Sequence, residues 1–260
     1  MTSAATPAPT PAALRRAAPP RRIWLAQTRM ELLLTLRRGE SVLLTFLIPI
    51  VILGFFSTID VLPYGDGDAI SFLFPGTMAL AVMSTAFVST AIATGFERQM
   101  GVLKRLGATP LTRGQLLLAK IGSIVVIEAL QVAILTGEGL LLGYRFEGAD
   151  LLLALVAAAL ATVAFAGLGL LMAGTLPALT TLAAANGVYL FLLLMSGMLF
   201  PVEELPGPLQ VVSEVLPSGA LAEIFRGTLG TDPVTARAWA VLVAWTVAAP
   251  VAAARLFRWE

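Results

Sequence analysis

A long stretch without charge limits what this chain can fold into. No Asp, Glu, Lys or Arg occurs from Leu151 to Val202. As one helix this stretch would measure roughly 78 Å at 1.5 Å per residue, whereas the hydrocarbon core of a bilayer is about 30 Å thick. The stretch therefore predicts two membrane-spanning helices. The break between them is the segment Gly174-Thr175-Leu176-Pro177.

The composition of the rest of the chain also indicates a membrane protein. Hydrophobic residues make up 58% and charged residues 13%, against roughly a quarter charged in a soluble domain. We predict an all-α polytopic protein with a single transmembrane domain over residues 23–260, after a disordered cytosolic tail at residues 1–22. Its six transmembrane helices are expected at residues 41–59, 69–95, 121–142, 151–174, 178–200 and 238–254.

The segment before the first span has the pattern of an amphipathic helix. Ile23, Ala26, Met30 and Leu33 fall on one stripe, with arginines around it. This pattern predicts a helix that lies in the cytosolic surface of the membrane. The alternative is a solvated helix packed on a partner.

The positions of the basic residues predict the orientation of the chain. Of 17 Lys and Arg residues, only Arg145, Arg226 and Arg237 fall on the side opposite to the N-terminus. Cytoplasmic loops carry the excess of Lys and Arg. We therefore expect a multi-pass protein of the plasma membrane, the cell inner membrane in bacteria, with both termini in the cytoplasm.

The inner loop between the second and third predicted spans contains a short amphipathic helix. Val102, Leu103 and Leu106 form its apolar stripe, and Lys104 and Arg105 lie beside it. Thr112 and Gln115 have the spacing of a capping box that starts the next helix. Because an apolar stripe on so short a helix needs a covering surface, we expect it to contact lipid or protein.

Several polar residues lie inside the predicted spans. Glu128 and Gln131 share one face of the third span, Ser84 lies in the second span, and Asn186 lies in the fifth. These four residues are candidates for the lining of a transport path. The alternative is a buried hydrogen bond or close packing that holds helices or subunits together.

Two blocks of residues together resemble a known family. The first is Phe74-Pro75-Gly76 with the inner-loop residues Glu97-Arg98-Gln99, Gly101, Leu103-Lys104-Arg105-Leu106 and Thr109-Pro110. The second is Ser196-Gly-Met-Leu-Phe-Pro201-Val-Glu203-Glu-Leu-Pro206, then Leu216-Pro217 and Glu223-Ile-Phe-Arg226. Over residues 23–257 the chain resembles ABC transporter type-2 permeases. Gln99 departs from the family's usual acidic residue, so the resemblance implies no charge pair at that position.

The resemblance implies how such a chain works. Residues 97–106 would form a coupling helix that docks into an ATP-binding subunit, with Glu97 and Arg98 at its start and Leu103 and Leu106 as apolar contacts. The other implied coupling residues are Gly101, Lys104, Arg105, Thr109 and Pro110. Short re-entrant helices in the outer leaflet would close an exit gate whose residues are Gly197, Phe200, Pro201, Glu203, Pro206, Pro217 and Arg226.

The resemblance also implies partners and cargo. Two permease chains, identical or paralogous, would pair in the lipid membrane and each bind one ATP-binding subunit. The cargo would be amphipathic drugs, natural products or lipids, with a glycan or polysaccharide precursor as the alternative. We expect no nucleic-acid partner.

The residues themselves argue against catalysis by this chain. It has no histidine and no cysteine, which removes the commonest general base, the commonest metal ligand and all thiol chemistry. We therefore expect no catalytic residue, no metal site and no bound cofactor. The nearest match to a phosphate-binding loop, Gly114 to Lys120, lacks the second glycine, so ATP and Mg²⁺ are expected on a partner chain.

An ion-coupled secondary transporter or channel is the rival interpretation. Such a protein usually carries a set of ionisable groups inside the membrane. In this sequence only Glu128 lies deep within a predicted span.

Overall fold

The structure is a computed structural model that describes residues 19–37, 39–59, 68–107, 112–146 and 148–257, without the side chains of residues 20, 39–44, 107 and 113. Every described element is a helix, in agreement with the predicted all-α fold. The elements are α1 (Pro20–Arg37), α2 (Gly39–Thr58), α3 (Ala69–Met83), the π-helix η1 (Ser84–Ser89), α4 (Thr90–Gln99), α5 (Val102–Gly107), α6 (Arg113–Leu141), α7 (Leu151–Thr175), α8 (Ala178–Leu194), the 3-10 helix η2 (Val202–Glu204), α9 (Gly207–Val215), α10 (Pro217–Leu229) and α11 (Ala236–Leu256).

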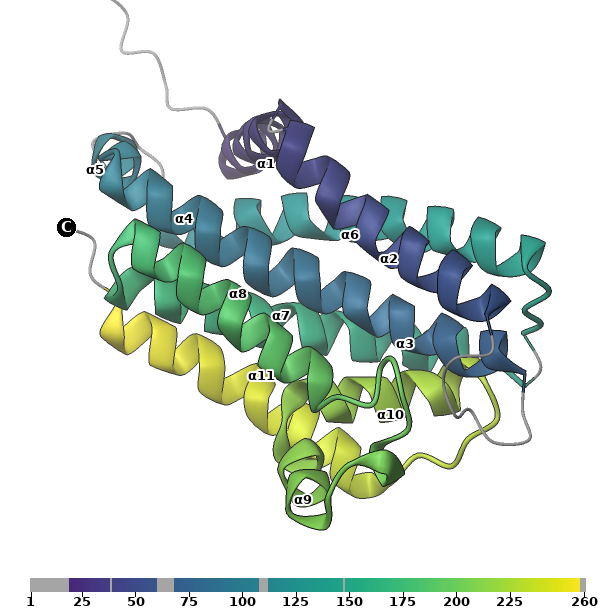
Figure 1. Cartoon of the computed structure of the whole chain (residues 1–260). Coiled ribbons are helices and arrows are strands. Elements are labelled where there is room, and N and C mark those ends of the chain that lie inside the picture. The colour runs from purple at the N-terminus through teal and green to yellow at the C-terminus, as the bar shows by residue number, and fades with distance from the viewer. Residues whose placement is uncertain (1–18, 38, 60–67, 108–111, 147, 258–260) are drawn as a thin grey trace, which may run out of the picture.

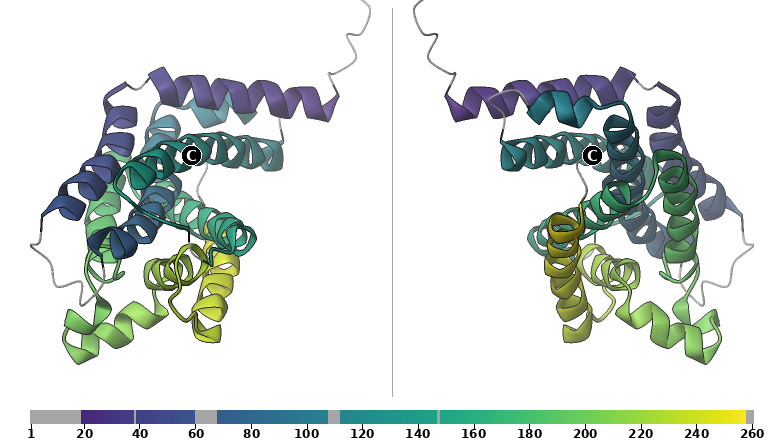
Figure 2. Two further views of the ribbon diagram at one scale, coloured as in Figure 1. Left: turned by 90° about the vertical axis from the view of Figure 1, so that its right-hand side faces the viewer. Right: turned by 90° about the vertical axis from the view of Figure 1, so that its left-hand side faces the viewer.

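The longer helices run side by side along one axis (Figure 1). One end of this bundle, here called the α5 end, holds α5, the α7–α8 connection and the last turn of α11. The α6–α7 connection lies at the opposite end. Helix α1 runs across the other helices rather than along them (Figure 2) and packs against α6 and α2. This crossing helix is the predicted amphipathic segment.

In the described part of the chain, four helices are long and apolar enough to cross a membrane: 69–99, 114–141, 151–175 and 236–256. Two shorter apolar helices, 45–58 and 178–194, occupy the positions of the other predicted spans. The structure therefore supports the predicted set of apolar helices, whereas the number of helices that cross the membrane stays a prediction.

Two helices differ in extent from the predicted spans. Helix α6 begins at Arg113, where the predicted capping box of Thr112 and Gln115 forms with both hydrogen bonds, so the helix extends ahead of the span predicted from residue 121. The fifth span ends at Leu194 rather than residue 200, because the chain turns at Gly197, whose φ of 70° lies in the left-handed region that favours glycine.

The predicted tail, residues 1–22, is only partly described. Residues 1–18 lie outside the described residues. Helix α1 already begins at Pro20, so residues 20–22 belong to the helix and not to the tail. Proline is well tolerated in the first turn of a helix, because the backbone N–H groups of that turn have no acceptor within the helix and the lack of one N–H costs nothing there.

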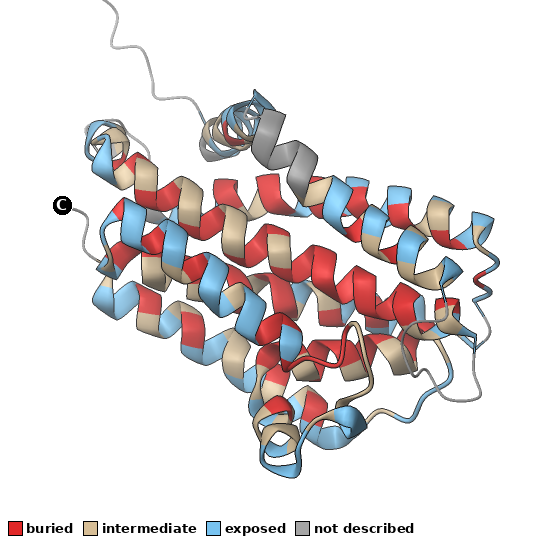
Figure 3. Cartoon of the chain, in the orientation of Figure 1, coloured by how far each residue is buried: buried red, intermediate tan, exposed pale blue. Residues whose placement is uncertain are grey.

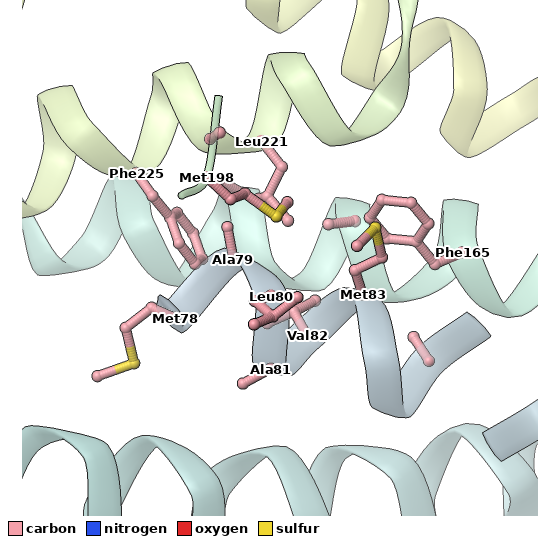
Figure 4. Packing of buried hydrophobic residues seen from close by; sticks show 14 of the residues in the cluster. Met78, Ala79, Leu80, Ala81, Val82, Met83, Phe165, Met198, Leu221 and Phe225 are labelled. Carbon is pink, nitrogen blue, oxygen red and sulfur yellow. The ribbon is translucent and has the colours of Figure 1, made fainter. Parts of the chain in front are cut away.

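Helix α3 forms the centre of the bundle. Every residue from Leu73 to Met83 is buried, so the helix has no solvent- or lipid-facing side over this length (Figure 3). Its side chains pack against Phe165 of α7, Met198, and Leu221 and Phe225 of α10 (Figure 4). The chain then passes through η1 into α4 without leaving helical conformation. Elements α3, η1 and α4 therefore form one continuous central helix.

Two glycines allow other segments to approach this central helix closely. A Cβ atom at Gly76 would overlap the carbonyl oxygen of Met198. A Cβ atom at Gly169 of α7 would lie 2.7 Å from the carbonyl oxygen of Phe87 in η1. The Phe74-Pro75-Gly76 motif thus meets the Ser196–Pro206 block in direct backbone contact.

The predicted short helices before the last span are present as η2, α9 and α10. Helix α10 is not peripheral, because Leu221, Ile224 and Phe225 are buried against the bundle. Helix α9 lies at the surface, where the Arg237 guanidinium of α11 binds the Glu214 carboxylate at 2.5 Å. These contacts attach α10 to the bundle and α9 to α11.

We expect Gly76→Ala to destabilise the protein by about 1–3 kcal/mol, because the added methyl group has no room beside the Met198 carbonyl. Thermal unfolding of the purified protein in detergent measures the effect. Gly137→Ala is the matched control, since a Cβ atom at this helical position of α6 meets nothing within 4 Å. Equal unfolding temperatures for the two variants would contradict the close approach.

Candidate functional site

The short helix α5 is separated from the central helix by a single turn. Helix α4 ends at Gln99, and Gly101 adopts a φ of 68°, which reverses the chain before α5 begins at Val102. The predicted coupling helix over residues 97–106 is therefore divided. Glu97 and Arg98 belong to the last turn of α4 and therefore to the central helix.

A buried ion triad anchors this last turn. The Lys120 ammonium of α6 binds the Glu97 carboxylate of α4 at 2.6 Å and the Glu31 carboxylate of α1 at 3.1 Å. All three residues are at most 7% exposed. The Gln27 amide also donates to Glu31 at 2.9 Å. Because charges in such a site are costly unless they are paired, the triad joins α1, α4 and α6 at the α5 end.

Arg98 anchors the same turn to the α7–α8 connection. Its guanidinium donates to the carbonyl oxygens of Gly174 and Leu176, both at 2.6 Å. These carbonyls belong to the last turn of α7 and the break after it, where helical partners are missing. The base of α5 is therefore attached to α1, α6 and α7 by charged groups.

The side chains of α5 itself divide into a buried and an exposed set. Leu103 is 4% exposed and packs inside the chain, which does not favour the predicted contact with a partner. Leu106 is half-buried, whereas Met100, Lys104 and Arg105 are exposed. The exposed surface of this segment is thus one apolar and two basic side chains. Thr109 and Pro110 lie outside the described residues.

A cavity of about 360 Å³ lies beside the central helix. It is bordered by α1, α2, η1, α4, α6 and α8, and Glu31 and Lys120 of the triad form part of its wall. Ser84 and Asn186, two of the four predicted path-lining residues, also border it. The structure thereby brings together residues from six elements around one space.

Glu128 and Gln131 are not among the described residues that border this cavity, and their place on a transport path stays a prediction. Glu128 accepts a hydrogen bond from the Thr162 hydroxyl of α7 at 2.8 Å. The Gln131 side chain accepts from the Thr85 hydroxyl of η1 and donates to the Thr45 carbonyl of α2. Both residues therefore make hydrogen bonds between helices, which is what the alternative interpretation expects.

At the opposite end of the bundle, Arg226 organises part of the predicted gate. Its guanidinium donates to the Gly197 carbonyl at 2.6 Å and lies 5.2 Å from the Phe72 ring centroid of α3. Burial lowers the pKa of Arg226, and nearby carboxylates, Asp232 foremost, oppose that shift. Arg226 therefore links α10, the 195–201 turn and α3.

The other predicted gate residues are more dispersed. Pro217 is buried at the start of α10, whereas Phe200 and Pro201 are half-buried and Glu203 and Pro206 are exposed. The structure brings Gly197 and Arg226 into direct contact and leaves Glu203 and Pro206 at the surface. Their role at a gate stays a prediction.

Three buried polar side chains were not recognised from the sequence: Glu31, Lys120 and Tyr144. Tyr144 follows α6, donates a hydrogen bond to the Leu229 carbonyl at 2.6 Å and has a pKa raised to about 12 by burial. The signal available for Lys120 was its position about two turns after the capping box, at the start of an apolar span where an unpaired charge is costly.

We expect Lys120→Met to destabilise the protein by about 3–5 kcal/mol, because it leaves two carboxylates buried without their cation. Thermal unfolding and proteolysis of α1 in the purified protein measure the effect. The exposed Lys104→Met variant is the matched control and should unfold like the parent. Adding Glu31→Gln and Glu97→Gln to Lys120→Met should recover much of the loss, and no recovery would contradict the triad.

Comparison with known proteins identifies the family. Residues 23–229 match the family model described as ABC-2 type transporter, which is more than half of the chain. Nodulation protein J of Rhizobium meliloti (strain 1021) is 29% identical over 178 residues, which make up 63% of this chain and 63% of that relative. The chain thus aligns with less than two thirds of the relative's length. The chain belongs to the ABC-2 type transporter family and is a multi-pass membrane subunit of a transporter.

Proposed function

We propose that this chain is the permease subunit of an ATP-driven exporter and that α5 receives the movement of a separate ATP-binding subunit. The observation that carries this proposal is how α5 is attached to the rest of the chain. On one side, Glu97 and Arg98 fix its base to three other helices. On the other side, Met100, Lys104 and Arg105 are exposed and available to a partner. Family membership supports an ATP-binding partner.

The contacts give a route for the movement. A displacement of α5 acts first on the last turn of α4, and the triad carries it to α1 and α6. Because α4 continues through η1 into α3, the same displacement reaches Gly76 and its contact with Met198. The Met198 segment also holds Gly197, the partner of Arg226. The proposed gate is therefore mechanically connected to α5.

The proposal assigns ATP and Mg²⁺ to the partner subunit. It places both termini and α5 in the cytoplasm of a plasma-membrane protein, in keeping with the distribution of Lys and Arg. Two permease chains pair in the membrane around the path. The cargo proposed is an amphipathic drug, natural product or lipid, with a glycan precursor as the alternative.

The rival function, ion-coupled transport, lacks a supporting observation. Glu128 is hydrogen-bonded to Thr162 and lies away from the cavity wall. Among the described residues, the ionisable groups that border the cavity are Glu31, Lys120 and Tyr189, and the first two are already paired with each other. A proton or ion site would require a group free to change its charge.

We expect the double variant Lys104→Glu, Arg105→Glu to weaken co-purification of the ATP-binding subunit at least tenfold, because it reverses the charge of the exposed surface of α5. Pull-down from detergent extracts, with membrane insertion checked by protease protection, measures the effect. Arg21→Glu with Arg22→Glu is the matched control, since both arginines are exposed on α1. Equal loss in both variants would place the contact elsewhere.

In vesicles that contain this chain, we expect export only when the ATP-binding subunit and ATP are also present. The measurement is uptake of a fluorescent amphipathic compound into inside-out vesicles, with and without ATP. A non-hydrolysable ATP analogue serves as the control. Transport by the chain alone under an imposed proton or sodium gradient would overturn the exporter proposal.

A further inference from the structure

The exposed surface of the crossing helix α1 is positively charged throughout. The helix contains four arginines, and all of them are exposed: Arg21, Arg22, Arg29 and Arg37. None of the four makes an ion pair with another described residue. The helix has one acidic residue, Glu31, which is 7% exposed and binds Lys120. The triad thus removes from this surface the carboxylate that would balance its charge.

Two of the arginines point directly away from the bundle. At about 100° per residue, Arg22 lies about 180° and Arg29 about 160° around the helix from Glu31, which faces the bundle. Apolar side chains lie on both sides of these arginines, among them Leu25, which is 55% exposed, and Met30, which is 53% exposed. Arginines set among exposed apolar side chains suit a boundary between water and hydrocarbon.

The level at which α1 crosses α6 agrees with such a boundary. At the crossing, Lys120 binds Glu31, and a Cβ atom at Gly122 would lie 3.1 Å from Cγ2 of Thr28. From this point α6 continues to Leu141 over roughly 30 Å at 1.5 Å per residue, which equals the thickness of the hydrocarbon core of a bilayer. Because α1 runs across the bundle (Figure 2), it lies along one edge of that thickness.

An anionic phospholipid matches this surface better than other partners. It carries a phosphate, which guanidinium groups bind with two hydrogen bonds, and apolar chains on the same molecule. A zwitterionic phospholipid offers the same phosphate, but its ammonium group weakens the attraction to arginine. An acidic protein would match the charge of α1 and not its place at the edge of the apolar thickness.

We propose that the outward face of α1, defined by Arg22, Arg29 and Arg37, binds anionic phospholipids of the leaflet on the α5 side. The three arginines follow one another at intervals of roughly 11 and 12 Å along the helix, far enough apart to hold separate head groups. The lipid is a partner of α1 alone and does not depend on an ATP-binding subunit. The inference therefore goes beyond the proposed function.

The test uses one fluorescent label on the full chain. The sequence contains no cysteine, so Ala26→Cys gives a unique site on the exposed face between Arg22 and Arg29. The labelled protein is placed in phosphatidylcholine vesicles with a trace of phosphatidylglycerol or phosphatidylcholine that carries the same nitroxide quencher on its acyl chain. We expect about fivefold stronger quenching by the phosphatidylglycerol, the selectivity of one arginine near an anionic lipid. A label at Leu179→Cys, exposed in the first turn of α8, should be quenched equally by both lipids.

Substitutions then locate the lipid site. Arg29→Gln should lower the preference for phosphatidylglycerol at the Ala26→Cys label by about twofold or more, and Arg22→Gln with Arg29→Gln and Arg37→Gln should abolish it. Arg255→Gln is the matched control, because this arginine is also exposed at the α5 end, in the last turn of α11. Unfolding temperatures verify that the variants fold, since the three side chains are exposed and lie outside the triad.

Two results would overturn the proposal. Equal quenching of the Ala26→Cys label by the two lipids would assign the arginines to an acidic protein partner instead. A preference that survives the triple substitution would place the lipid elsewhere on the chain. Because the measurement requires neither ATP nor a second subunit, its failure leaves the tests of the exporter proposal unaffected.

Discussion

The structure depends on one ammonium group placed between two carboxylates in a largely apolar bundle. Lys120 holds Glu97 and Glu31 at hydrogen-bonding distance, and the opposite charges offset the cost of burying each group. This constraint fixes where α1 crosses the bundle and how the last turn of α4 is oriented. Arg98 fixes the same turn from the other side. The position of α5, the wall of the cavity and the path of any force through the molecule all follow from these contacts.

The parts of the fold that depend on local sequence could be predicted. The uncharged stretch after Leu151 predicted a hairpin with its break at 174–177, and helices α7 and α8 meet there. The capping box at Thr112 was also recognised and forms as expected. The division of the coupling segment at Gly101 was not predicted, because many glycines lie in helices and only the observed φ of 68° marks this one as a turn. Local sequence patterns thus predicted the helices but not every point at which a helix begins or ends.

The candidate site was harder to predict because its residues are distant in sequence. Lys120 and Glu31 are separated by 89 positions and Lys120 and Glu97 by 23, so no spacing rule relates them. The basic residues of an inner loop look alike in sequence, although Lys104 is exposed and Lys120 is buried. The apolar residues of this segment show the same difficulty. The stripe of the short helix predicted Leu103 as a contact for a partner, but the structure buries Leu103 and exposes Met100. Tertiary packing therefore decides which basic and which apolar side chains stay exposed and available to a partner.

The ratio of two carboxylates to one ammonium also constrains how such a chain can diverge. A mutation that removes one carboxylate leaves a neutral ion pair, whereas a mutation that removes the lysine leaves two like charges in an apolar place. Loss of Lys120 is therefore better tolerated once a carboxylate has been replaced than before it.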